Sequence, residues 1–137
     1  MSINTQLETR HEESLIELPD PRGHVNWLLS LANLETSVCL KFIDPYGDTV
    51  FNTLQLPALL CELEAIAPLV TETNLLAAKI QYLDGTITWP ALARDDARTQ
   101  VESLSVDDLQ GHLNSLLELV KDALRRGPHH YCRFVGD

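Results

Sequence analysis

Hydrophobic and polar residues alternate near both ends of the chain, in the pattern typical of half-buried β-strands. Residues 3–9 alternate apolar or threonine side chains with polar ones, and residues 130–136 have a β-rich composition. Because successive side chains of a strand point to opposite faces of a sheet, both segments are predicted to be strands. Residues 39–43 and the C-terminal segment have similar compositions, since each contains a cysteine, a basic, an aromatic and a β-branched residue. This similarity favours placing both segments in one sheet.

Residues 37–52 are predicted to form a β-hairpin. Residues 37–43 are β-rich, and residues 49–52 resume the strand pattern. The intervening sequence Asp44-Pro45-Tyr46-Gly47-Asp48 provides proline and glycine where a turn needs a preset and a permissive backbone angle.

Apolar residues at helical spacing predict two helices in the first half of the chain. The first covers residues 25–32, and Asp20 can cap it, with Pro21 at the first helical position. The second begins at Pro57 and ends at about Ala67, just before a further proline.

Residues 105–126 carry the strongest helical signal. Ser105 is a capping hydroxyl followed three residues later by an acid, and Gly127-Pro128 ends the segment. One apolar stripe extends over more than two turns and consists of Leu109, Leu113, Leu116, Leu117, Val120 and Leu124.

Residues 75–89 fit two patterns. Leu76, Ile80 and Leu83 repeat at helical spacing, whereas residues 79–89 read as two strands joined by Asp84-Gly85, a favoured tight-turn pair. We favour the hairpin, because the turn and the cross-strand register agree. Residues 90–98 are then a connecting loop or a short irregular helix.

The order of these elements predicts an α+β fold with a mainly antiparallel sheet and helices packed on one face. The length of 137 residues fits a single domain, residues 1–137, with residues 79–104 as a possible inserted hairpin and loop.

Charge narrows the range of partners. The chain has 10 basic and 20 acidic residues and a formal net charge of −10. Such a surface repels phosphate backbones and anionic lipids, so we expect neither nucleic acid nor a membrane as a partner.

The first fifteen residues lack the basic start and apolar run of a secretory signal, and the three cysteines lie among apolar residues, as in reduced core positions. We therefore expect a cytoplasmic protein.

Few residue patterns indicate catalysis or metal binding. His11-Glu12-Glu13 begins like a zinc-protease helix, but position 15 is leucine where a second histidine is needed. A denser C-terminal group can be read as a metal, ligand or enzyme site, aided by the Asp44–Asp48 turn; it consists of His129, His130, Cys132 and Asp137. We favour a core role for Cys132 and turn roles for the aspartates, and we expect no cofactor and no catalytic residue.

The acidic surface is the remaining functional signal. We hypothesise a protein-binding domain, of the kind seen in small acidic immunity and inhibitor proteins that bind basic partners; the comparison rests on charge and size. The candidate acidic contact residues are Glu12, Glu13, Glu17, Asp20, Asp95, Asp96, Asp107 and Asp108. The candidate buried anchors are Trp27, Trp89 and Tyr46. A homodimer formed through exposed apolar stripes is a further alternative.

Overall fold

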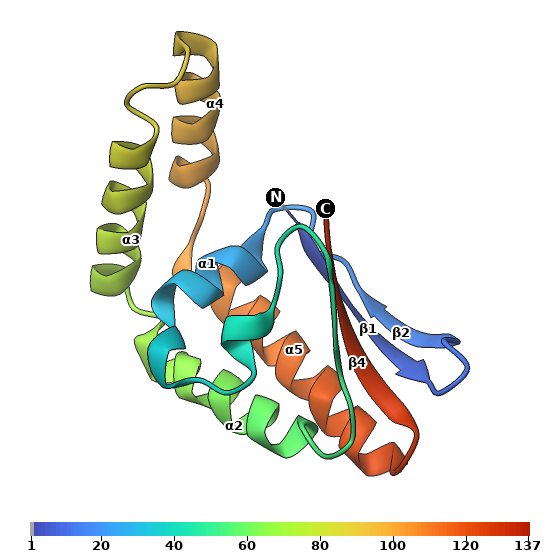
Figure 1. Ribbon diagram of the computed structural model, residues 1–137. Coiled ribbons are helices and arrows are strands. Elements are labelled where there is room, and N and C mark those ends of the chain that lie inside the picture. Colours follow the sequence, from blue (N-terminus) through green and yellow to red (C-terminus); the bar gives the residue numbers. More distant parts are fainter. Residues whose placement is uncertain (1) are drawn as a thin grey trace.

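The computed structural model in Figure 1 describes residues 2–137 and contains a four-stranded antiparallel sheet with helices on one face. This arrangement confirms the predicted α+β class. The strands are β1 (Ile3–Thr9), β2 (Ser14–Leu18), β3 (Asp48–Phe51) and β4 (His130–Gly136), in the order β2-β1-β4-β3. The first and last strands of the chain are therefore neighbours in the middle of the sheet, and the two termini lie side by side.

Five α-helices complete the fold. They are α1 (His24–Leu31), α2 (Leu56–Ile66), α3 (Glu72–Gly85), α4 (Ala91–Glu102) and α5 (Val106–Arg126). Three short 3-10 helices connect them, η1 (Leu34–Thr36), η2 (Leu40–Phe42) and η3 (Ala67–Leu69). Helices α1, α2 and α5 surround the core, whereas α3 and α4 form a helical hairpin that projects away from it (Figure 1).

The core lies between α5 and the inner face of the sheet. Ser105 caps α5 as predicted, since its side chain accepts a hydrogen bond of 3.1 Å from the amide of Asp108. The buried positions of α5 are Leu109, Leu113, Leu116, Leu119, Val120 and Ala123. Two predicted stripe residues, Leu117 and Leu124, are only partly buried, because α5 packs against α1 and α2 as well as the sheet and its buried arc is shifted.

Residues 14–18 form a strand that the pattern did not predict. β2 lies at the sheet edge and pairs with β1 alone among the described strands, and all five of its side chains are polar or partly exposed apolar groups. A tight turn joins the two strands, with Glu12 at a φ of 61°. Edge strands need only one apolar contact face, so their sequence signal is weak.

The predicted strand at residues 37–43 is wrong. This segment contains η2 and no strand, and only residues 48–51 of the expected hairpin enter the sheet, where they pair with β4. The carboxylate of Glu62 on α2 accepts hydrogen bonds from the amides of Val38, Cys39 and Leu40 at 2.8, 3.1 and 3.0 Å. Because these amides donate to a side chain, they are not available for pairing with a strand.

The predicted β-hairpin at residues 79–89 is also wrong. Residues 72–85 form α3, whose first turn is capped by Thr71, and Asp84-Gly85 ends the helix. Leu75 is buried, and the ammonium group of Lys79 donates to the carbonyl of Leu104 at 2.8 Å. Most of residues 90–98, expected as a connecting loop or a short irregular helix, belongs to the regular helix α4. The helical alternative for residues 75–83 is the correct one.

We predict that Glu62→Ala lowers the free energy of unfolding by about 2 kcal/mol, because it leaves the amides of residues 38–40 without their charged acceptor. Denaturant unfolding measures the change. Glu64→Ala on the exposed side of the same helix is the control and should change stability by less than about 0.5 kcal/mol.

The same interaction predicts a pH dependence. Burial alone would raise the pKa of Glu62, but the three backbone hydrogen bonds and nearby Lys41 outweigh it and lower the pKa. A carboxyl with a lowered pKa in the fold stabilises the protein above its unfolded pKa of about 4.3, and this contribution is lost as the pH falls through the folded value. The stability difference between wild type and Glu62→Ala should therefore shrink below about pH 4; an unchanged difference would contradict the assignment.

Candidate functional site

The projecting α3–α4 hairpin exposes an unusual share of the large apolar side chains. Twelve such side chains are exposed among the described residues, and six of them lie between positions 76 and 92. They are Leu76, Ile80, Tyr82, Ile87, Trp89 and Leu92. A concentration of exposed apolar side chains on one element is typical of an interaction surface.

A cleft lies between α1 and this hairpin. It has a volume of about 860 Å³, and Trp27, Tyr82 and Trp89 line it. The ring centroids of Trp27 and Tyr82 are 5.3 Å apart, and those of Tyr82 and Trp89 are 6.4 Å apart with a nearly perpendicular edge-to-face arrangement. The remaining lining is mostly polar and uncharged and includes Gln81 and Gln100. We call this feature the aromatic cleft.

Acidic residues outnumber basic ones in the sequence of α4 and the segments that flank it. Residues 84–108 contain six acidic and two basic side chains. Asp96 precedes the lining residue Gln100 by one helical turn and so lies on the same side of α4. At the opposite wall, the lining residue Arg22 forms an ion pair of 3.5 Å with Asp108, which offsets its positive charge.

The structure brings some of the predicted contact residues together. Trp27 and Trp89 line the same cleft, and four predicted acids lie on α4 or at the start of α5: Asp95, Asp96, Asp107 and Asp108. Tyr46 is exposed in the turn before β3 and is not part of the cleft lining. Tyr82 was missed as an anchor, because the hairpin prediction placed it opposite Ile87; its helical spacing from Leu75 and Ala78 was the available signal.

Asp20 cannot contribute to a contact surface, because it is fully buried. Its carboxylate accepts hydrogen bonds from the amides of His24 at 2.6 Å and of Ile3 and Val25 at 3.2 Å. The predicted helix start is therefore wrong, since Gly23 is the N-cap, α1 begins at His24 and Pro21 lies in the turn before it. The Asp20 carboxylate nevertheless accepts from the first two amides of α1.

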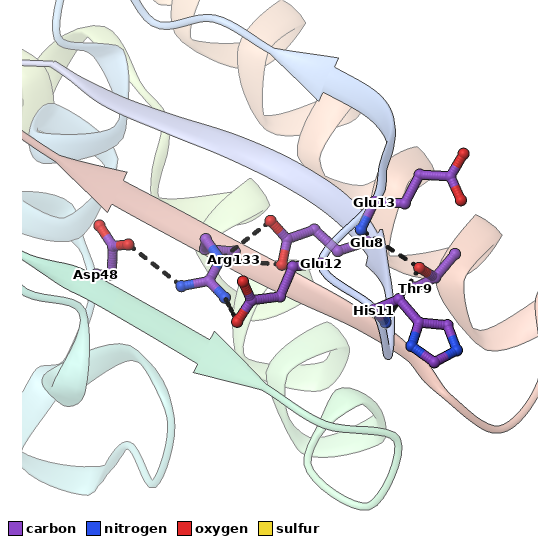
Figure 2. A network of polar contacts seen from close by, with 7 residues as sticks. All are labelled: Glu8, Thr9, His11, Glu12, Glu13, Asp48 and Arg133. Atoms are coloured by element: carbon purple, nitrogen blue, oxygen red, sulfur yellow. Dashed lines mark hydrogen bonds and ion pairs between the residues drawn. The ribbon is translucent and has the colours of Figure 1, made fainter.

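The remaining predicted acids, Glu12, Glu13 and Glu17, belong to the β1–β2 hairpin, on the side of the molecule away from α3 and α4 (Figure 1). Figure 2 shows the polar network beside them. Arg133 on β4 donates to both carboxylate oxygens of Glu8 on β1 at 2.9 and 3.0 Å and to Asp48 on β3 at 3.2 Å. Glu12 approaches the same guanidinium at 3.9 Å.

The Arg133 network is a structural feature of the sheet. The hydrogen bond to Glu8 is the main cause that raises the pKa of Arg133, and Glu8 itself is buried. The network joins three strands across the uncovered face of the sheet, and the side chain of Thr9 fixes the adjoining turn by accepting from the amides of His11 and Glu13 (Figure 2). Three carboxylates around one cation leave a negative balance there as well.

The C-terminal group is not brought together as a ligand set. Cys132 is fully buried in the core, whereas the His130 ring contacts the carbonyls of Gly127 and Pro128, and His129 is exposed. Asp137 lies beyond the other end of β4, where it accepts from the backbone amide and hydroxyl of Ser2. Gly47 and Gly136 are hydrogen-bonded neighbours, but the nearby Asp44 and Asp48 engage the amide of Tyr46 and the side chain of Arg133, respectively.

One other group of ligand-type side chains does converge within residues 2–137. Asp20, His24 and His112 each place a ligand atom within 4.8 Å of those of the other two. Asp20 and His24 are four residues apart, which was a usable sequence signal, but nothing in the sequence links them to His112.

Comparisons of the chain with protein families, with curated proteins and with solved structures gave no significant match. Among the described residues, every helix is too short or too polar to cross a lipid bilayer. The functional conclusion therefore rests on the geometry and charge of the chain itself.

Thiol reactivity tests the placement of the cysteines. Cys39 and Cys132 are buried and Cys61 is exposed, and burial raises the pKa of Cys132 to about 12. We predict that a chromogenic disulfide reagent labels one thiol rapidly in native protein and all three in denaturant. Cys61→Ser should remove the fast phase; labelling of native Cys132 at the rate of Cys61 would contradict its core position.

Proposed function

We propose that the protein is a non-enzymatic binding domain that captures a basic partner protein in the aromatic cleft. The observation that carries this proposal is the combination of three aromatic rings in one cleft with a projecting, acidic helical hairpin that exposes further apolar side chains.

Charge complementarity favours a basic partner over other occupants. Arginine and lysine side chains stack on tryptophan and tyrosine faces, and the acids of α4 and of the start of α5 are placed to receive their charge. The net charge of −10 would in addition accelerate the encounter with such a partner and disfavour acidic ones.

The aliphatic side chains define the partner further. Ala78 and Leu104 line the cleft beside the three rings, so an occupant needs apolar groups beside its basic ones. Leu76 and Ile80 lie one turn apart on the opposite side of α3. An amphipathic basic helix has this composition. The cytoplasmic immunity or inhibitor role, in which the domain would cover the basic face of a toxin-like protein, is our specific version of this proposal.

A synthetic peptide provides a defined probe for the cleft. We predict that a fluorescein-labelled 18-residue helix with leucine and arginine on opposite faces binds the protein, whereas the same peptide with glutamate in place of arginine does not. Trp89→Ala should weaken binding about tenfold, because it removes an exposed anchor of the cleft. Fluorescence anisotropy measures both, and equal binding of the acidic peptide would contradict the proposal.

Matched charge reversals locate the interface. Asp95→Lys, Asp96→Lys and Glu102→Lys together should weaken peptide binding about tenfold or more, since these acids lie on the hairpin. The triple variant Glu12→Lys, Glu13→Lys and Glu17→Lys changes the net charge equally on the β1–β2 hairpin and should cost less than about threefold. A larger effect of the second variant would move the interface to the sheet side.

Sedimentation velocity tests the competing occupant, a second copy of the chain. We expect a monomer at micromolar concentrations. A dimer that Trp89→Ala dissociates would assign the aromatic cleft to self-association and overturn the proposal for a separate partner.

A further inference from the structure

The strongest unassigned feature is the meeting point of the buried Asp20 with the half-buried His24 and His112. These side chains come from the segment after β2, the first turn of α1 and the middle of α5. One potential ligand atom of each lies within 4.8 Å of those of the other two. The two imidazole rings meet edge to face, with their centroids 5.4 Å apart.

Both imidazoles have an unsatisfied atom at this point. The Nε2 atoms of His24 and His112 are buried and have no hydrogen-bond partner in the described part of the chain. Leaving a buried polar atom without a partner is unfavourable, and two adjacent cases in one cluster require an explanation.

The third member is an oriented carboxylate. Oδ1 of Asp20 accepts from the amide of His24, and Oδ2 accepts from the amides of Ile3 and Val25. A carboxylate has about four acceptor positions, so these three hydrogen bonds leave it able to bind a cation. Hydrogen bonds of this kind typically fix the orientation of metal-binding carboxylates.

We propose that Asp20, His24 and His112 form a binding site for a zinc ion. Two imidazole nitrogens and one carboxylate are a common zinc ligand set, and a tetrahedral ion would have one further position for water or another donor. Bonds of about 2.0–2.2 Å in tetrahedral geometry place ligand atoms about 3.4 Å apart, so the three atoms would close in by at most about 1.4 Å. Because α1 and α5 carry the histidines, the ion would tie these two helices together.

The site adjoins the aromatic cleft but does not depend on its proposed role. His24 also contributes to the cleft lining. Zinc binding and peptide binding are tested by different variants, and either proposal can fail alone.

Metal binding to purified, chelator-treated protein tests the proposal. We predict one zinc ion per chain by isothermal titration, and a visible absorption spectrum of tetrahedral character when Co²⁺ is bound instead. Free zinc at 100 times the dissociation constant should raise Tm by about 5–10 °C, and a chelator should reverse the shift.

His112→Phe distinguishes a built site from surface binding. The variant keeps a ring at the contact with His24 and removes the orphaned nitrogen, so the metal-free protein should be as stable as wild type or more so. Its zinc affinity should fall at least about 50-fold and its Tm should become independent of zinc. His24→Gln is the second variant, and exposed His129→Phe is the control that should bind zinc as wild type does.

Two results would overturn the proposal. The first is the absence of stoichiometric zinc binding by folded wild-type protein. The second is zinc binding that His112→Phe and His24→Gln leave unchanged while His129→Phe reduces it, which would indicate an adventitious surface ion only.

Discussion

The buried carboxylate of Asp20 connects the sheet to the helical layer through hydrogen bonds. The positions of both candidate sites depend on this connection. Asp20 accepts hydrogen bonds from the first residue of β1 and from the first two residues of α1, while its own amide donates to the side chain of Asn4 at 2.8 Å. A buried charge requires such compensation, because it has lost its hydration. Trp27 lies one turn further along α1, so the same contacts set the direction of one wall of the aromatic cleft.

The fold separates stability from recognition. The core is closed by α5, the first and last strands, and the helices α1 and α2. The α3–α4 hairpin contributes few residues to that core and retains exposed apolar side chains, which a purely structural element would not need. Exposed acidic groups lie on both sides of the molecule, and a second pocket of about 500 Å³ between β2 and α5 is lined by Glu17, Glu118 and Asp122. Three aromatic rings, however, line the cleft at the hairpin side and are not part of that second pocket. This coincidence is why we place the proposed partner there.

Local sequence signals predicted the elements that local interactions determine. The strands at residues 3–9 and 130–136 and the helix at residues 106–126 have clear periodicity and end signals, and all three are present. The predictions failed where a distant residue decides the structure. Glu62 takes the amides of a β-rich segment more than twenty residues earlier, and packing on α1 favours a helix at residues 72–85, where a turn pair suggested a hairpin. The candidate sites were likewise predictable only where single residues carry the signal. Trp27 and Trp89 were identified individually as anchors. The approach of His112 to Asp20 and His24 results from the tertiary fold and has no sequence signal.

Amide hydrogen exchange measured by NMR on wild type and Asp20→Ala tests the central role of the Asp20 carboxylate most directly. The account predicts slow exchange at Ile3, His24 and Val25 in the wild-type protein. In Asp20→Ala, these three amides should lose protection and the indole resonance of Trp27 should shift, while amides in the middle of α5 stay protected. Equal exchange at the three amides in both proteins, with Trp27 unchanged, would contradict the account.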